Sequence, residues 1–199
     1  MKFLTWASVA IAACFCAFNL YAEDIKDSST GETFPREVSF DLGGKNYNLQ
    51  ATGVATRKKL IATVYSVASY VQDASTLGGD KFAAILSNDR AKQLTLKWVR
   101  DVDSAKIQEG FKDSLKTSFG EEGYKAHEAD INKFLGFFNH NVTKGEEQII
   151  RTANGTVEVL IGGNKVGEVS NPEVAQGIWK IWFGDKAVVD RNNLVSLVK

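Results

Sequence analysis

EEQIIRTANGTVEVLIGGNKVGEVS, residues 146 to 170, is the stretch that decides the predicted fold class. Asn154-Gly155 separates two runs rich in Ile, Val and Thr, and this dipeptide is the strongest short-range signal for a hairpin because both residues tolerate a positive φ. Gly162-Gly163 predicts a second tight turn with a third strand after it. Three consecutive antiparallel strands, a meander, are therefore expected here.

Further strands are expected ahead of this meander. In REVSFDLGGKNYNLQATGV, residues 36 to 54, apolar and polar residues alternate around Gly43-Gly44, which predicts a strand, a tight turn and a returning strand. LIATVYSVASYV, residues 60 to 71, is rich in β-branched and aromatic residues, and its near-continuous apolarity predicts a long strand buried on both faces. A basic cluster, Arg57-Lys58-Lys59, stands directly before that strand, and residues 92 to 99 return to strand alternation.

Helical signals lie between and after these strands. In residues 101 to 119 apolar side chains recur four positions apart, which predicts an amphipathic helix capped by Asp103 or Ser104. Similar spacing predicts a helix within residues 128 to 138, and a last helix is expected after the capping pair Asn171-Pro172. Because strands outnumber helices and mostly adjoin one another, we predict an α+β domain, a large antiparallel sheet with a layer of helices packed on one face.

The first 22 residues resemble a targeting signal. One lysine, an uncharged apolar run and a small-residue site predict a secretory signal peptide cleaved after Ala22, and hence a periplasmic or secreted protein. Two alternatives rank after simple cleavage of the signal peptide. One is an uncleaved membrane anchor, and the other is a lipoprotein with Cys14 as the lipidated residue. Residues 23 to 35 are polar and are predicted to form a flexible leader, and residues 36 to 199 a single domain without cysteine.

Composition narrows the classes of partner. The chain has 24 basic and 24 acidic residues, and this neutrality argues against nucleic acid or an anionic membrane as partner, because both need a clustered positive field. No membrane span is expected once the signal peptide is removed. The two histidines lack a second ligand at metal-binding spacing, and the sequence contains no phosphate-binding motif, dinucleotide-binding motif or nucleophile elbow. Neither a metal nor a cofactor is therefore predicted.

Three segments carry a resemblance to a known family: GVATRKKLIATVYSVASYV at residues 53 to 71, NGTVEVLIGGNKVGEVSNPE at 154 to 173, and IWKIWFGDKAVV at 178 to 189. In order and spacing they resemble the bacterial chalcone isomerase-like proteins, exported relatives of the plant chalcone isomerases and plastid fatty-acid-binding proteins. The likeness spans about residues 36 to 198. It implies a chalcone isomerase-like fold, with a ligand cleft between a large antiparallel sheet and a layer of helices.

The resemblance also implies two ligand-binding residues. In the family an arginine just before the long central strand holds the anionic group of the ligand, and this position falls on Arg57; a hydroxyl-bearing partner on the strand falls on Tyr65. A guanidinium fork suits a carboxylate, and a phenol adds a further hydrogen bond. In an extended strand the two would lie about 26 Å apart, so they meet only if a turn or bulge intervenes near Lys58-Lys59. From the residues alone, the alternative is that Arg57 is a solvated surface charge like these lysines.

The remaining catalytic positions of the plant enzymes are not matched. By resemblance, their tyrosine falls near Ala105 or Lys106, their asparagine near Lys112 and their threonine on Ile181. Cyclisation of a chalcone needs hydrogen bonds that orient the reactants and stabilise the developing enolate. We therefore predict no efficient chalcone cyclisation and assign no catalytic residue, and turnover of another substrate stays open.

Three functions are compatible with these residues. The leading hypothesis is a non-catalytic binder of a small amphipathic or aromatic acid, such as a fatty acid, with Arg57 and Tyr65 on the carboxylate and four aromatic side chains over the tail: Phe111, Phe134, Trp179 and Trp182. The first alternative is a chalcone isomerase-type intramolecular lyase or isomerase, with Arg57 as electrophile and Tyr65 as acid. The second is an envelope protein-interaction module that uses the lysine pair and the two tryptophans. The ligand and the oligomeric state are left open.

Overall fold

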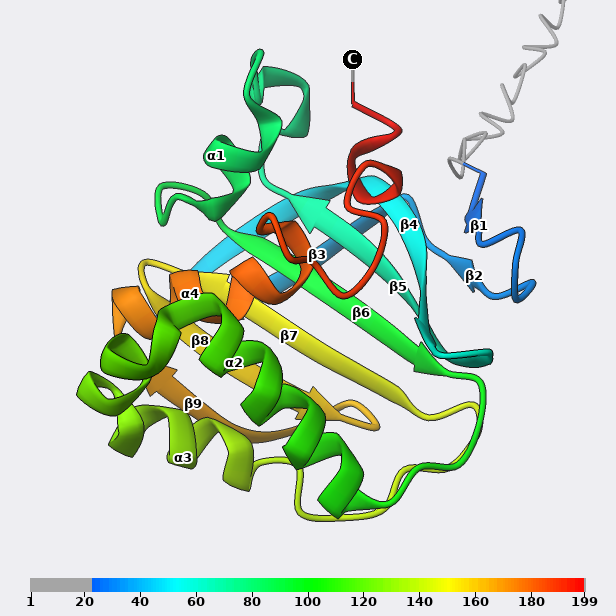
Figure 1. The fold of residues 1–199 in the computed structure, drawn as a ribbon. Helices are drawn as coiled ribbons and strands as arrows, with labels where there is room; N and C mark the ends of the chain where they lie inside the picture. The colour runs from blue at the N-terminus through cyan, green and yellow to red at the C-terminus, as the bar shows by residue number, and fades with distance from the viewer. Residues whose placement is uncertain (1–22, 199) are drawn as a thin grey trace, which may run out of the picture.

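A seven-stranded antiparallel sheet organises the computed structural model, which describes residues 23–198 (Figure 1). Each strand pairs with its neighbour in the chain, from β3 to β9. The strands are β3 Glu37–Leu42, β4 Lys45–Lys59, β5 Ala62–Val71, β6 Lys92–Trp98, β7 Glu147–Ala153, β8 Thr156–Ile161 and β9 Asn164–Ser170. The predicted signal peptide, its cleavage after Ala22 and the alternative lipidation of Cys14 lie outside the described residues.

Three of the turns predicted from the sequence are confirmed. The φ angles are 62° and 76° at Gly43-Gly44, 51° and 73° at Asn154-Gly155, and 55° and 79° at Gly162-Gly163. Glycine adopts these left-handed values without a steric penalty, and asparagine tolerates them better than most residues. These turns join β3 to β4, β7 to β8 and β8 to β9 in antiparallel register.

The hairpin between β4 and β5 differs from the prediction. The basic cluster Arg57-Lys58-Lys59 ends β4 instead of standing before a new strand, and Leu60-Ile61 forms the two-residue turn into β5. Leu60 has a φ of 55° there. Neither residue is one that tight turns favour, so the sequence pattern indicated a strand starting at residue 60. β5 itself is buried along most of its length, as predicted.

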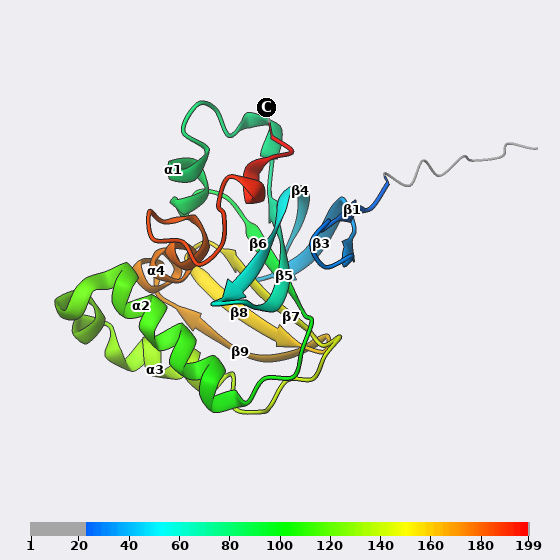
Figure 2. The ribbon, with the colours of Figure 1, turned by 45° about the vertical axis from the view of Figure 1, so that its right-hand side comes forward.

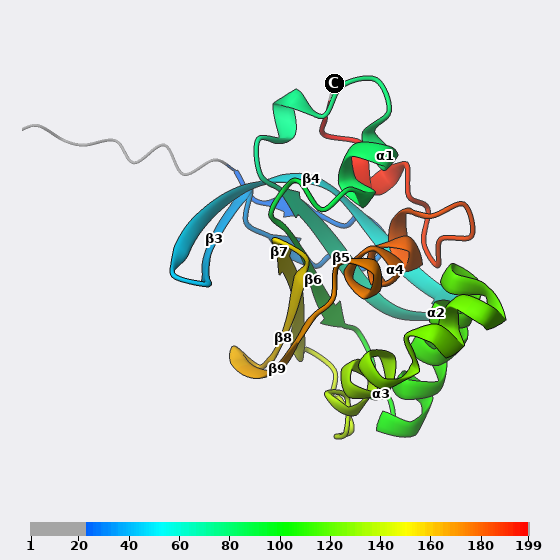
Figure 3. The ribbon, with the colours of Figure 1, turned by 90° about the vertical axis from the view of Figure 1, so that its left-hand side faces the viewer.

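The helices cover one face of the curled sheet, which confirms the α+β architecture (Figure 3). At the start of the last helix, the Asn171 side chain accepts hydrogen bonds from the backbone N–H groups of Glu173 and Val174, as a helix cap does. A kink at Gly120, where φ is 70°, interrupts the longest helix. The helices are α1 Lys81–Leu86, α2 Ser104–Ala126, α3 Glu128–Gly136 and α4 Pro172–Phe183, with single 3-10 turns η1 Ala74–Thr76 and η2 Asn193–Val195.

The segment predicted as a flexible leader is instead folded onto the sheet. Two short strands, β1 Ile25–Lys26 and β2 Thr33–Phe34, pair with each other on the side of the sheet away from α2 and α4 (Figure 2). Asp27 is buried between them, and Phe34 packs in a hydrophobic cluster on that face. The prediction was made from the polar composition of the segment, whereas a few buried side chains are enough to hold it in place.

Two hydrophobic clusters lie on the two faces of the sheet. The larger cluster fills the space between the sheet and the helices, and the smaller one lies under the N-terminal segment. Beyond α4, the chain crosses β4, where the Thr52 hydroxyl donates a hydrogen bond to the Leu194 carbonyl. Within residues 23–198, no helix has the length and apolarity that a membrane span requires.

Candidate ligand cleft

A cleft of about 420 Å³ opens between one end of the sheet and helices α2 and α4. Strands β4, β5 and β6 and helices α2 and α4 contribute side chains to it. The principal lining residues are Arg57, Tyr65, Trp98, Ile107, Phe111, Ile181 and Val188. The cleft therefore lies where the fold implied by the sequence resemblance places a ligand.

Three of these residues form a row across neighbouring strands. Tyr65 on β5 pairs directly with Arg57 on β4 and with Trp98 on β6. Residues directly opposite each other in a sheet point to the same face, so all three side chains point toward the helices. The Leu60-Ile61 turn and a register shift after Arg57 replace the separation of an extended strand with direct pairing. The structure thus brings the two predicted binding residues together.

The Arg57 side chain is half-buried, and the backbone of the segment that follows α4 holds it in place. One guanidinium nitrogen, Nη1, donates a hydrogen bond of 2.7 Å to the Val188 carbonyl. The Val188 N–H in turn donates to the Ile181 carbonyl at 2.9 Å. Among residues 23–198, no carboxylate lies within 4.0 Å of the Arg57 guanidinium. A guanidinium carries five N–H donors, so several remain for a ligand.

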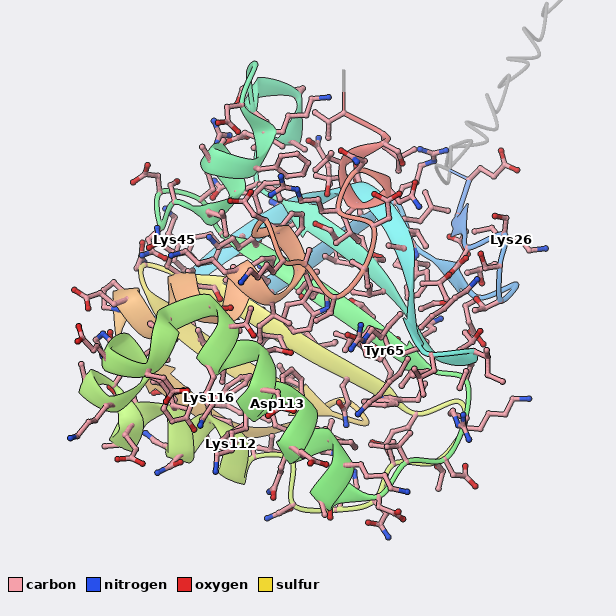
Figure 4. All side chains as sticks on the ribbon, viewed as in Figure 1. Lys26, Lys45, Tyr65, Lys112, Asp113 and Lys116 are labelled. Atoms are coloured by element: carbon pink, nitrogen blue, oxygen red, sulfur yellow. The ribbon has the colours of Figure 1, made fainter. Side chains whose placement is uncertain are left out.

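Tyr65 is buried beside Arg57 with its hydroxyl oxygen already in use as an acceptor. Trp182 Nε1 donates to it at 3.1 Å, so the phenolic proton is free to be donated to another group. Burial raises the pKa of Tyr65 to about 12, against the smaller opposing effects of the Arg57 charge and the Trp182 hydrogen bond. Tyr65 is therefore a neutral donor at physiological pH. Figure 4 shows it on the strand end beside α2.

Aromatic packing fixes the walls of the cleft. The Trp98 ring stands edge-on to Tyr65, with 5.3 Å between ring centroids. Phe111 lines the cleft, and behind it Phe134, Phe138 and Trp182 lie within 6.0 Å between centroids. Such edge-to-face and offset contacts favour a defined geometry. The inner wall is therefore rigid and predominantly apolar.

Only one of the four aromatic residues predicted to cover a ligand tail lines the cleft. Phe111 lines it, whereas Phe134, Trp179 and Trp182 are fully buried in the core. The Trp179 indole N–H donates to the Thr152 hydroxyl at 2.8 Å, on the inner face of the sheet. Sequence spacing identified these residues as apolar faces of helices. It could not tell a cleft wall from the core behind it.

Two of the positions that the resemblance assigns to further catalytic groups lie at the cleft, but the residues there differ from those of the plant enzymes. Lys106 and Ile181 line the cleft, and Lys112 is exposed on α2 (Figure 4).

Within residues 23–198, no three His, Cys, Asp or Glu side chains converge as metal ligands would. The two histidines pair with carboxylates instead, His127 with Glu173 and His140 with Glu146.

The rim of the cleft is charged. Arg100, Lys59 and Lys106 contribute cations to it, and Asp101 and Asp103 contribute carboxylates. Both carboxylates have partners: Asp101 accepts from the Lys144 backbone N–H at 2.7 Å, and Asp103 lies 3.2 Å from the Lys106 ammonium. Both rim carboxylates thus have partners, whereas no described carboxylate lies within 4.0 Å of the Arg57 guanidinium.

Among the contributors to the cleft that sequence reasoning missed are Trp98 and Val188. Trp98 lies 33 positions after Tyr65 in the chain, and Val188 contributes a backbone carbonyl that no side-chain pattern reveals. Trp98 Nε1 makes no hydrogen bond to any described residue. The alternation of apolar and polar residues in the strand at residues 92 to 99 indicates that Trp98 points inward. It does not indicate that Trp98 pairs with Tyr65, because that pairing depends on the register of the sheet.

A family model described as chalcone isomerase-like matches residues 27–193, and the chain therefore belongs to this family. Among solved structures, it is similar to a fatty-acid binding protein of Arabidopsis thaliana. The two share 18% sequence identity with a TM-score of 0.73, over 87% of this chain and 96% of that one. No curated protein matches the chain. At this level of identity, the likeness establishes the fold alone.

Proposed function

We propose that the protein is a non-catalytic binder of a small amphipathic acid such as a fatty acid. Arg57 and Tyr65 would hold the carboxylate, and the apolar walls around Phe111 and Ile181 would enclose the start of the tail. The observation that carries this proposal is a half-buried guanidinium that lines a mainly apolar cleft and has no carboxylate partner among the described residues.

The donors match an anionic head group. A half-buried guanidinium that has lost part of its hydration gains most from an anion with two acceptor oxygens. Tyr65 adds an O–H whose proton is not used by the protein, since its oxygen accepts from Trp182. A carboxylate at this place would receive hydrogen bonds from both side chains.

The chemistry of the cleft favours binding over turnover. A phenol with a pKa of about 12 is a weak acid and is not ionised at neutral pH, so Tyr65 supplies a hydrogen bond more readily than a proton. Ile181 offers no polar group where the plant enzymes carry a threonine. The fatty-acid binding protein of A. thaliana, which shares the fold, supports the same choice of ligand class.

The test compares two ligands that have the same chain length, one with a charged carboxylate and one with a neutral hydroxyl as head group. Binding of dodecanoate and of dodecanol is measured by calorimetry for the wild type, for Arg57→Ala and for Arg36→Ala, an exposed arginine outside the cleft. Loss of a hydrogen bond to a charged group predicts that Arg57→Ala weakens dodecanoate binding by at least about tenfold. Dodecanol binding should change little, and Arg36→Ala should behave as the wild type.

Two results would overturn the proposal. One is equal affinity of the wild type and Arg57→Ala for dodecanoate, which would show that Arg57 does not bind the carboxylate. The other is a steady turnover of a chalcone by the wild type that Arg57→Ala abolishes, which would favour the isomerase alternative. Mass spectrometry of small molecules that copurify with each variant identifies the natural ligand class.

The place of action is part of the proposal. We infer from the first 22 residues that the chain acts in the periplasm or outside the cell after cleavage behind Ala22. N-terminal sequencing of protein recovered from the cell envelope and from the medium tests this. A chain that begins at Met1 in both fractions would contradict it.

A further inference from the structure

The turn between β4 and β5 exposes two large apolar side chains at the mouth of the cleft. Leu60 is 95% exposed and Ile61 101%, whereas the other exposed large apolar residues of the described chain, Val166 and Leu197, are 41% and 44% exposed. Leu60 also lines the entrance of the cleft. In Figure 1 the turn lies on the right-hand side of the molecule, below β1 and β2 and away from α3 and the C-terminus.

This choice of residues is unfavourable for the turn itself. The three other tight turns of the sheet place glycine or asparagine at positive φ, but here leucine takes a φ of 55°. Leucine in the left-handed region is strained, and neither side chain regains stability by packing, since both are in water. The hairpin therefore carries apolar groups that its own folding does not need.

Cations flank the apolar pair. Lys58 and Lys59 are exposed immediately before Leu60, and Arg100 is exposed at the neighbouring rim. The carboxylates at the mouth, Asp101 and Asp103, are engaged with the Lys144 N–H and with Lys106. We call Lys58, Lys59, Leu60 and Ile61 the hairpin tip. It combines a clustered positive charge with exposed aliphatic surface. The neutrality of the whole chain argued against an anionic membrane as partner, but net charge does not show how the cations are distributed, and here two lysines stand directly before two exposed apolar side chains.

We propose that the hairpin tip docks on a lipid bilayer that contains anionic phospholipids. Leu60 and Ile61 would enter the interfacial region, and Lys58 and Lys59 would lie among the phosphate groups. Apolar burial and attraction of lysines to anionic lipids act together in peripheral binding of this kind. Because the cleft opens beside the tip, docking would place its mouth at the membrane surface, where an amphipathic acid resides.

The docking itself does not depend on the proposed ligand, and only its purpose rests on the proposed function. An experiment can therefore contradict the docking proposal without contradicting the ligand proposal, and the reverse. A protein that binds vesicles but no fatty acid would keep the docking surface and lose the ligand, and one that binds dodecanoate but no vesicle would do the reverse.

Vesicle flotation with the full chain tests the proposal. The partition of the protein is measured on vesicles of phosphatidylcholine mixed with phosphatidylglycerol, and on phosphatidylcholine alone. Loss of two exposed aliphatic groups predicts that the double variant Leu60→Ser, Ile61→Ser partitions at least about tenfold less. Lys58→Gln with Lys59→Gln should lower the partition roughly tenfold on the anionic vesicles and little on the neutral ones.

Matched controls separate the tip from the rest of the surface. Leu197→Ser removes an exposed leucine elsewhere, and Lys112→Gln with Lys125→Gln removes two exposed lysines from α2. Both variants should partition as the wild type does. All variants share residues 1–22, so a contribution of that segment is common to them. Equal partition of the tip variants and the controls would overturn the proposal.

A label at the tip makes the result independent of other contacts. Cys14→Ser and Cys16→Ser remove the two cysteines of the chain, and an environment-sensitive dye is attached at Ile61→Cys or, as control, at Lys112→Cys. Anionic vesicles should shift the emission of the dye at position 61 to the blue and leave that at 112 unchanged. An unshifted emission at 61 overturns the proposal. So does a protein complex or dimer that Leu60→Ser, Ile61→Ser abolishes while no variant binds vesicles.

Discussion

At the scale of single residues, the Tyr65 hydroxyl has two roles in the same place. Its oxygen accepts a hydrogen bond from the buried Trp182 indole, and its proton stays available to a group in the cleft, which Tyr65 lines beside Arg57. The neighbouring buried tyrosine, Tyr70, provides a contrast, because its hydroxyl makes no hydrogen bond to any described residue. The Tyr65 hydroxyl thus contacts both the core and the cleft, whereas the Tyr70 hydroxyl makes no such contact with the described residues.

We expect Tyr65→Phe to weaken dodecanoate binding about fivefold, as loss of one hydrogen bond of about 1 kcal/mol implies. The same change leaves Trp182 Nε1 buried without an acceptor, so the free energy of unfolding should fall by about 1 to 3 kcal/mol. Calorimetric titration measures the first effect and urea denaturation the second.

Tyr70→Phe is the matched control for this prediction. Removing a buried hydroxyl that lacks a partner costs nothing in hydrogen bonding, so affinity should be unchanged and stability unchanged or higher. If Tyr65→Phe behaved in the same way, the hydroxyl of Tyr65 would have no role in either the cleft or the core.

At the scale of elements, one carboxylate fastens the N-terminal strands to the sheet. Asp27 accepts hydrogen bonds from the Thr56 and Ser66 hydroxyls, each at 2.6 Å, and from the Ser29 N–H at 2.8 Å. Thr56 and Ser66 are paired in register, one step along β4 and β5 from Arg57 and Tyr65. Because successive residues of a strand face opposite sides, Asp27 lies directly behind the candidate binding pair.

We expect Asp27→Asn to lower the free energy of unfolding by about 1 to 3 kcal/mol at neutral pH, since an amide is a poorer acceptor than a carboxylate. Burial alone would raise the pKa of Asp27, but hydrogen bonds from Ser66, Thr56 and Ser29 lower it below the value of 3.8 for an unperturbed group. A depressed pKa stabilises the native state above 3.8, and this contribution is lost as pH falls through the native pKa. The wild type should therefore lose its advantage over the variant in acid.

Hydrogen exchange of residues 23 to 34 is the direct measurement for this prediction, because the segment should open in Asp27→Asn before the sheet unfolds. Asp24→Asn changes an exposed carboxylate in the same segment and should leave exchange unaltered. Equal protection of the segment in Asp27→Asn and the wild type would show that its apolar contacts are sufficient.

At the scale of the whole molecule, the C-terminal segment closes the domain over β4. Thr52 donates to the Leu194 carbonyl at 2.7 Å, and the Leu197 N–H donates back to the Thr52 carbonyl at 2.9 Å. Gly53 makes this approach possible, since a Cβ at that position would lie 2.0 Å from the Asn193 carbonyl oxygen. The same segment begins with Val188, whose carbonyl holds Arg57.

Gly53→Ala should therefore destabilise the protein by about 1 to 3 kcal/mol, because the backbone of the C-terminal segment has to move. It should also weaken dodecanoate binding, as Val188 shifts away from Arg57. Gly136→Ala, at a helical position with open space around it, should instead stabilise by about 0.5 to 1 kcal/mol. Urea denaturation and calorimetry compare the two, and equal stability would contradict the close approach at Gly53.

Much of the fold was predictable because its signals are local. Asn154-Gly155 and the two glycine pairs mark turns through their own backbone preferences, and Asn171 marks a helix start through its own side chain. The Leu60-Ile61 turn was not predictable, because neither residue prefers it. The anchoring of residues 23 to 35 was missed for a similar reason, since Asp27 finds its partners 29 and 39 positions away.

By itself, the sequence determined the order of strands and helices, the antiparallel sheet class and, through the family resemblance, the identity of Arg57 and Tyr65 as candidate binding residues. Only the tertiary structure decided that these two are paired across β4 and β5, that Trp98 and the Val188 carbonyl complete their surroundings, and that Phe134 and Trp179 belong to the core. The physical reason is distance along the chain. Turns and caps depend on residues a few positions apart, whereas the cleft depends on register and packing between segments up to 131 positions apart.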